Sequence, residues 1–139
     1  MITEKILEAL TDENVQDIVD IGAEGGINYW AIEPIDQEFA GLPEGKSYTF
    51  VEGEHDTWMG QESTREVDAV HYVSKDEIRV AYARLLDLNQ EFVNREYHGY
   101  ILQSWIERND KDGIDTAHID AGTADVIIQL AALGEIRYG

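Results

Sequence analysis

The sequence predicts an α+β fold in which a small antiparallel sheet of three to four strands packs with four to five helices. Apolar residues recur at helical spacing near the start of the chain and again through its second half. Between these parts lie runs rich in β-branched and aromatic residues, which favour strands. No linker or repeat divides the 139 residues, so we expect a single domain, 1–139, with the order ααβββααα and a further strand at the end.

Two helices and a strand are predicted before the first proline. Apolar spacing indicates amphipathic helices over 2–10 and 12–24. Gly25 follows the second helix, and glycine commonly ends a helix because it adopts positive φ without strain. The segment 27–32 is too rich in β-branched and aromatic residues to continue the helix, so we expect the first strand there.

The middle of the chain predicts a pair of strands joined by a long connection. Residues 47–51 and 67–73 have strand-like composition, and we expect them to pair antiparallel. The segments 34–46 and 52–64 are polar and hold glycines, so they are interpreted as loops. A loop as long as 52–64 is usually functional or mobile.

Two helices follow this pair of strands. Ser74 and Glu77 have the spacing of a capping box, in which each side chain accepts a hydrogen bond from a free backbone N–H of the other residue. They should open the longest helix of the chain. A further helix is expected over about 96–108.

The last helix is strongly apolar and carries small residues on one side. Thr123 should cap it, it should run over 124–133, and Gly134 should end it. The segment 135–138 can add a final short strand. The helix either lies in the centre of the core or forms a close-packed interface through which the chain makes a homo-oligomer.

The net charge of the chain is far more negative than solubility requires. Twenty-nine acidic residues face ten basic ones, which gives −19, whereas a magnitude of about 2–8 suffices for a small domain. Residues 1–70 hold 17 of the acids and three of the bases. This field repels nucleic acid and anionic membranes and attracts basic proteins. A merely solvated surface, a phosphate-mimicking surface and adaptation to high salt all agree with it.

The cellular compartment is suggested by what the sequence lacks. There is no cysteine, so nothing depends on an oxidising environment. No run of about 18 apolar residues and no basic-then-apolar leader is present, so neither a membrane span nor a secretory signal is expected. We therefore expect a cytoplasmic protein.

No sequence pattern for catalysis, cofactors or metals stands out, so the sequence predicts a non-enzymatic protein without cofactor or metal. The segment 110–115 alternates carboxylates around a glycine as a calcium loop does. Placing Gly113 at the sixth loop position, however, puts Arg108 first and Ile119 last, where carboxylates are required. The segment 52–56 holds three acids and one imidazole, but no second histidine lies at metal-binding spacing.

Exposed aromatic residues would give the chain an alternative function, as a sponge for a small ligand or nucleotide. Aromatic rings after the double glycine at 25–26 can stack on a planar ligand. The glycines close a helix rather than open one, so they make no phosphate cradle. The candidate ligand-binding residues are three aromatics and two arginines: Tyr29, Trp30, Trp58, Arg65 and Arg79.

Two segments, EGGINYW at 24–30 and ADVIIQL with GEIRYG within 124–139, resemble a family of small acidic proteins of uncharacterised function. Bacteriophages and mobile regions of bacterial genomes encode this family. The resemblance supplies no catalytic residues and implies a cytosolic phage or prophage product. Small acidic phage proteins are often inhibitors of host defence or of host nucleic-acid enzymes.

Charge and resemblance together predict a protein that binds a basic host protein through its acidic first half, as an anti-defence inhibitor or a nucleic-acid mimic. The alternatives are the ligand sponge and a structural or assembly component of a phage particle. Helical spacing gathers the densest row of carboxylates along 12–24. The candidate partner-binding residues are Asp12, Glu13, Asp17, Asp20 and Glu24.

Overall fold

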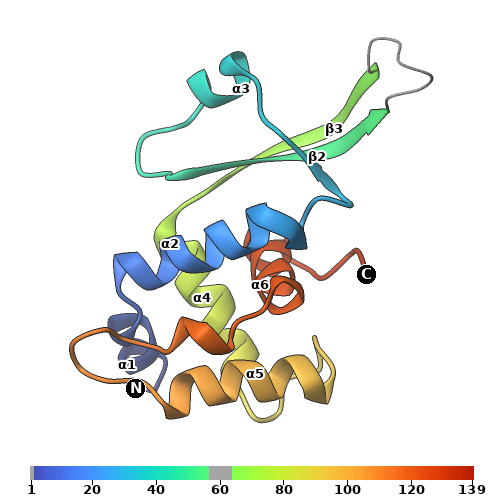
Figure 1. The fold of residues 1–139 in the computed structure, drawn as a ribbon. Coiled ribbons are helices and arrows are strands. Elements are labelled where there is room, and N and C mark those ends of the chain that lie inside the picture. Colours follow the sequence, from blue (N-terminus) through green and yellow to red (C-terminus); the bar gives the residue numbers. More distant parts are fainter. Residues whose placement is uncertain (1, 57–63) are drawn as a thin grey trace.

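The computed structural model describes residues 2–56 and 64–139 and shows the α+β fold that the sequence predicts. A three-stranded antiparallel sheet and the short α3 lie on one side of α2, and the other helices pack around and below it (Figure 1). The elements in chain order are α1 (Ile2–Ala9), α2 (Asp12–Ile21), the π-helix η1 (Gly22–Gly26), β1 (Ala31–Ile32), α3 (Asp36–Ala40), β2 (Tyr48–Asp56), β3 (Thr64–Val73), α4 (Lys75–Leu86), α5 (Arg95–Ile106), the 3₁₀-helix η2 (Thr116–His118) and α6 (Ala121–Leu133).

The strands β2 and β3 form a long antiparallel pair that extends from Tyr48 opposite Val73 to Asp56 opposite Thr64. The expected antiparallel pairing is confirmed. The expected loop at 52–64 is wrong at both ends, because residues 52–56 continue β2 and Thr64 already belongs to β3. This acidic stretch has little strand preference of its own, and hydrogen bonding to β3 overrides that preference.

The first strand is much shorter than expected, and Ile27 to Trp30 do not belong to it. The backbone N–H of Ile27 donates to the Gly22 carbonyl at 3.0 Å, and that of Ala31 donates to the Ile27 carbonyl at 2.9 Å. Helical turns therefore continue to the edge of the sheet, and β1 is left with two residues paired to β2. The aromatic residues that suggested a strand are placed by tertiary packing instead.

The glycines at the end of α2 serve close packing, not helix termination. Gly25 does not take positive φ, and η1 continues the helix through Gly26. A Cβ on Gly22 would collide with the Ile128 side chain of α6, and one on Gly26 would collide with the Ala121 carbonyl. The two glycines therefore let η1 lie directly against α6.

Helix α6 lies in the core, which was one of the two positions that the sequence left open for it. It begins one turn earlier than expected, because the Asp120 side chain, not that of Thr123, caps it by accepting from the Thr123 N–H at 2.7 Å. Gly134 ends the helix in the left-handed conformation, with φ of 76°, as expected. The segment 135–138 forms no strand and instead lies as an irregular tail.

The other helices agree more closely with the sequence. Ser74 and Glu77 make the expected capping box at the start of α4. Helix α5 begins at Arg95, one residue before the predicted start at about 96, and the Asn94 side chain caps it. The five-residue α3 lies inside the segment expected to be a loop. Across the described ranges, no helix has both the length and the apolar character needed to cross a membrane.

Candidate functional site

The exposed side of α2 and η1 carries most of the carboxylates expected to bind a partner. Glu13, Asp20 and Glu24 are exposed, and none of them forms an ion pair within the part of the chain that the structure describes. At about 1.5 Å of rise per residue, Glu13 and Asp20 lie roughly 10 Å apart along the helix axis. These three residues are called the acidic face below.

The other two candidates are engaged within the chain. Asp12 accepts from the Arg79 guanidinium at 2.6 Å and lies 3.6 Å from the Lys75 ammonium, and these two cations lower its pKa. Asp17 is half-buried and accepts from the Thr116 hydroxyl at 3.0 Å. The charge of Asp12 is therefore largely compensated, while Asp17 holds η2 against α2.

A mainly apolar cavity of about 470 Å³ adjoins the acidic face. Residues of α2, η1, β1, α3 and β2 and of the segments between them line the cavity. On the α3 side, Phe39 is 52% exposed and Leu42 is 37% exposed, so apolar surface continues to the rim. Exposed apolar surface beside unpaired charge is typical of protein-binding sites. The apolar residues that line the cavity are Val19, Ala23, Ile27, Ala31, Ile32, Pro34, Phe39, Leu42 and Phe50.

Two distant segments of the sequence, 24–30 and 124–139, meet in the fold around Asp125. This buried α6 carboxylate accepts from the Trp30 indole N–H at 2.7 Å and from the Tyr29 hydroxyl at 2.5 Å. Gln129, one turn further along α6, donates to the same carboxylate at 3.0 Å. Partial burial and the Asp125 charge raise the pKa of Tyr29, which therefore stays protonated and keeps donating.

A second buried carboxylate, Glu52 of β2, binds the side chains of the C-terminal tail and holds the tail against the sheet. It accepts from the Tyr138 hydroxyl, from Arg137 at 2.9 Å and from His71 at 2.9 Å. These hydrogen bonds, that of Tyr138 foremost, lower the pKa of Glu52. The Tyr138 ring stacks on Trp30 with centroids 5.8 Å apart, so the Glu52 and Asp125 networks are joined. The Asp125 network connects α6 to the segment after η1, and the Glu52 network connects β2 to the C-terminal tail.

The structure does not bring together the four candidate ligand-binding residues that it describes. Trp30 is 2% exposed and its indole N–H is already bound, so it offers no stacking surface, although the neighbouring Tyr29 is exposed. Arg65 pairs with Glu38 on α3, and Arg79 pairs with Asp12 and Asp76 beside α1 and α2. Trp58 lies outside the described residues.

The helix expected as a subunit interface, α6, is covered over most of its length by other described parts of the chain. Every residue of α6 from Thr123 to Leu130 is buried. Neighbours within the chain, including α2, α4, α5, η1 and β3, surround this stretch. The homo-oligomer expected through this helix therefore has no support from the structure.

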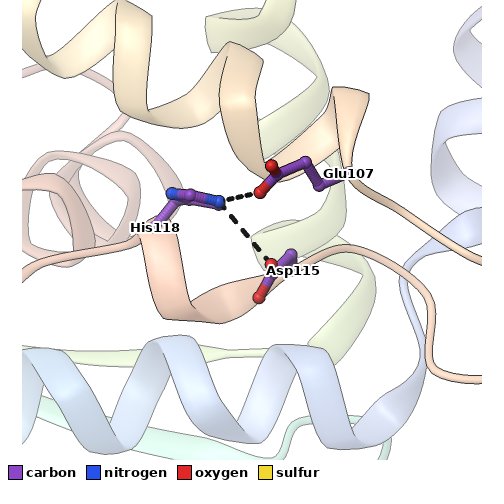
Figure 2. Close-up of side chains that lie close together, drawn as sticks. All are labelled: Glu107, Asp115 and His118. Carbon is purple, nitrogen blue, oxygen red and sulfur yellow. Dashed lines mark hydrogen bonds and ion pairs between the residues drawn. The ribbon is translucent and has the colours of Figure 1, made fainter.

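Three potential metal ligands, which sequence reasoning did not group, converge at the end of α5 (Figure 2). Glu107 follows the last residue of α5, Asp115 caps η2 and His118 is the last residue of η2. Their ligand atoms lie within 4.8 Å of one another, and the His118 Nε2 is 3.6 Å from an Asp115 oxygen and hydrogen-bonded to Glu107. The spacing of Asp115 and His118, one helical turn, was the available sequence signal.

The fold and these surfaces define an acidic α+β protein with an exposed carboxylate face, an adjoining apolar cavity and a cluster of one imidazole and two carboxylates. No protein-family model, no curated protein and no solved structure matches the chain.

Proposed function

We propose that this chain is a non-enzymatic phage-type protein that binds a basic host protein, inhibiting it by occupying its nucleic-acid-binding surface. The acidic face, Glu13, Asp20 and Glu24, carries this proposal. Its charges are exposed and free of internal cations among the described residues, so they are available to a partner. The three exposed carboxylates follow one another along α2 and η1, so they present a line of negative charge to a partner, as a phosphate backbone does.

The adjoining cavity supports binding of a protein rather than of a free cation. Charge speeds and orients association, whereas apolar anchors that fill a pocket supply most of the affinity. A basic partner with an apolar side chain next to its cationic residues would engage the face and the cavity together. The resemblance to phage-encoded proteins supports placing that partner in a bacterial host.

Reversing the charge of the acidic face tests the proposal. The variant carries Glu13→Lys, Asp20→Lys and Glu24→Lys, and a matched control carries Glu91→Lys, Asp110→Lys and Asp112→Lys, exposed carboxylates of the second half. Each immobilised protein is exposed to bacterial extract, and the bound proteins are quantified by mass spectrometry. We expect a basic protein on the wild type and the control, reduced at least about tenfold on the reversed variant.

Competition with duplex DNA then tests the mimicry. With the purified partner, DNA should displace the chain, and the affinity should fall as salt is raised. Equal retention of the partner on all three proteins would refute the role of the acidic face. A partner that binds DNA and this chain simultaneously would refute the mimicry alone.

The alternative functions gain less from the structure. The nucleotide sponge loses its stacking platform, because Trp30 is buried and Arg65 and Arg79 are paired in separate places. A structural role in a phage particle stays a prediction.

A further inference from the structure

We propose that Glu107, Asp115 and His118 form a binding site for a divalent first-row transition metal such as Zn²⁺. The proposal is independent of the partner-binding function. It rests on the chemistry and convergence of the three side chains, on the absence of a permanent cation beside them in the described part of the chain, and on how the fold holds them.

The donor set suits a transition metal better than calcium or magnesium. Zinc binds imidazole nitrogen and carboxylate oxygen at about 2.0–2.2 Å, and three protein ligands plus water make an open site. Calcium and magnesium prefer oxygen ligands alone. The 3.6 Å between His118 Nε2 and the Asp115 oxygen falls within the range that two ligands of one such ion adopt. Glu107, 46% exposed at its side chain, has room to adjust.

Among the described residues, neither carboxylate has a lysine or arginine as its partner. Within residues 2–56 and 64–139, only His118 pairs with Glu107 or Asp115. The adjacent Arg108 is turned away, since its guanidinium lies over the Trp105 ring at 4.0 Å and donates to the Trp105 carbonyl. Even a protonated His118 leaves one excess negative charge, whereas a divalent ion with a neutral imidazole balances both carboxylates.

The backbone around the ligands is held by contacts that do not use the ligand atoms. The buried Asn14 side chain of α2 bonds the backbone of Ile114 and Asp112, and the Asp115 N–H donates to Ser104 of α5 at 2.9 Å. The other Asp115 oxygen accepts from the Ala117 N–H, which orients the carboxylate toward His118. Ligands held in place by surrounding hydrogen bonds bind metal more tightly.

Isothermal titration with Zn²⁺ tests the site, using the full chain, its Glu107→Gln and His118→Gln variants, and Asp112→Asn as a control. Asp112→Asn removes one charge from the same loop but no ligand. We expect one saturable site in the wild type and the control, weakened at least about tenfold in both ligand variants. Ca²⁺ and Mg²⁺ should not compete.

Imidazole NMR signals of the wild-type chain give a readout that needs no variant. We expect the His118 ring nitrogens to shift on adding Zn²⁺, while those of His71, which is hydrogen-bonded to Glu52, stay in place. The proposal is overturned if Zn²⁺ leaves the His118 signals unchanged. It is equally overturned if Asp112→Asn weakens binding as much as Glu107→Gln, since the general negative charge would then account for the binding.

Discussion

At the scale of single residues, the carboxylates of this chain include two contrasting groups, one buried and one exposed. Glu52 and Asp125 are buried and each accepts three hydrogen bonds from other side chains, whereas Glu13, Asp20 and Glu24 are exposed without an internal cation among the described residues. A buried charge is tolerated only where hydrogen bonds and ion pairs compensate its lost hydration. The first group therefore stabilises the fold, and the partner binding that we propose uses the second.

Glu52 makes the stability of the fold depend on pH. Its pKa in the folded chain lies below the ordinary value of 4.5, so its contribution is present above that value and is lost as the pH falls through the lowered pKa. We expect Glu52→Gln to reduce the free energy of unfolding at pH 7 by about 2 kcal/mol, the range of hydrogen bonds to a charged group. Urea unfolding measures this change.

The neighbouring Glu54→Gln is the control, because Glu54 is exposed on the same strand. The difference between the two variants should be largest at pH 7 and should shrink below about pH 4.5. Equal stability of Glu52→Gln and Glu54→Gln at pH 7 would contradict the role given to the buried carboxylate.

A contact of the fold or of the candidate site could be predicted from the sequence when its residues lie close together along the chain. The capping box of Ser74 and Glu77 spans three residues, so the sequence shows it directly. Asp125 lies 95 residues from Trp30, and nothing local in either segment indicates that they meet. The cluster of Glu107, Asp115 and His118 lies between these cases. Asp115 and His118 are one turn apart, whereas Glu107 joins them through packing of α5 on η2.

At the scale of elements, the largest error concerned the segment after α2. Composition favoured a helix stop at Gly25 and a strand over 27–32, yet the helical path continues and the strand shrinks to two residues. Gly22 and Gly26 have a packing role that only the position of α6 reveals. Strand preference in 27–30 was outweighed by the burial of Trp30 beside Asp125.

Alanine substitutions in η1 test this packing role. Gly26→Ala places a Cβ against the rigid Ala121 carbonyl, and we expect a loss of about 1–3 kcal/mol, as in other overpacked sites. Gly25→Ala meets nothing within 4 Å and should be neutral or stabilising by up to about 1 kcal/mol, since alanine favours helix. The thermal unfolding midpoints of both variants test this expectation. If Gly25→Ala destabilised the fold more than Gly26→Ala, the interpretation of Gly25 as a helix end would be favoured instead.

At the scale of the whole molecule, the charge of −19 opposes folding because like charges are brought closer together. Salt screens such charges over about 10 Å at 0.1 M. We therefore expect the midpoint of thermal unfolding to rise by several degrees when NaCl is raised from low to physiological concentration. Differential scanning calorimetry measures it, and a midpoint independent of salt would show that the repulsion is already compensated.

The same repulsion separates stability from function in the reversed variant. Glu13→Lys, Asp20→Lys and Glu24→Lys together should raise the unfolding midpoint at low salt while weakening partner binding. If these three residues stabilised the fold instead, the substitutions would lower both stability and binding. Measuring both quantities on one preparation distinguishes these outcomes, and a loss of stability would contradict our assignment of the acidic face to binding.

The strand order β1-β2-β3 leaves β3 at an edge of the sheet, paired within the described chain to β2 alone. An unpaired strand edge invites a second copy to add its own strand, which is a common start of aggregation. Glu66 and Asp68, both exposed, lie on this edge and would face the same charges on an approaching copy. We therefore expect the surplus of carboxylates also to keep concentrated molecules apart. A basic molecule that neutralised Glu66 and Asp68 would remove this repulsion and favour self-association at the edge of β3.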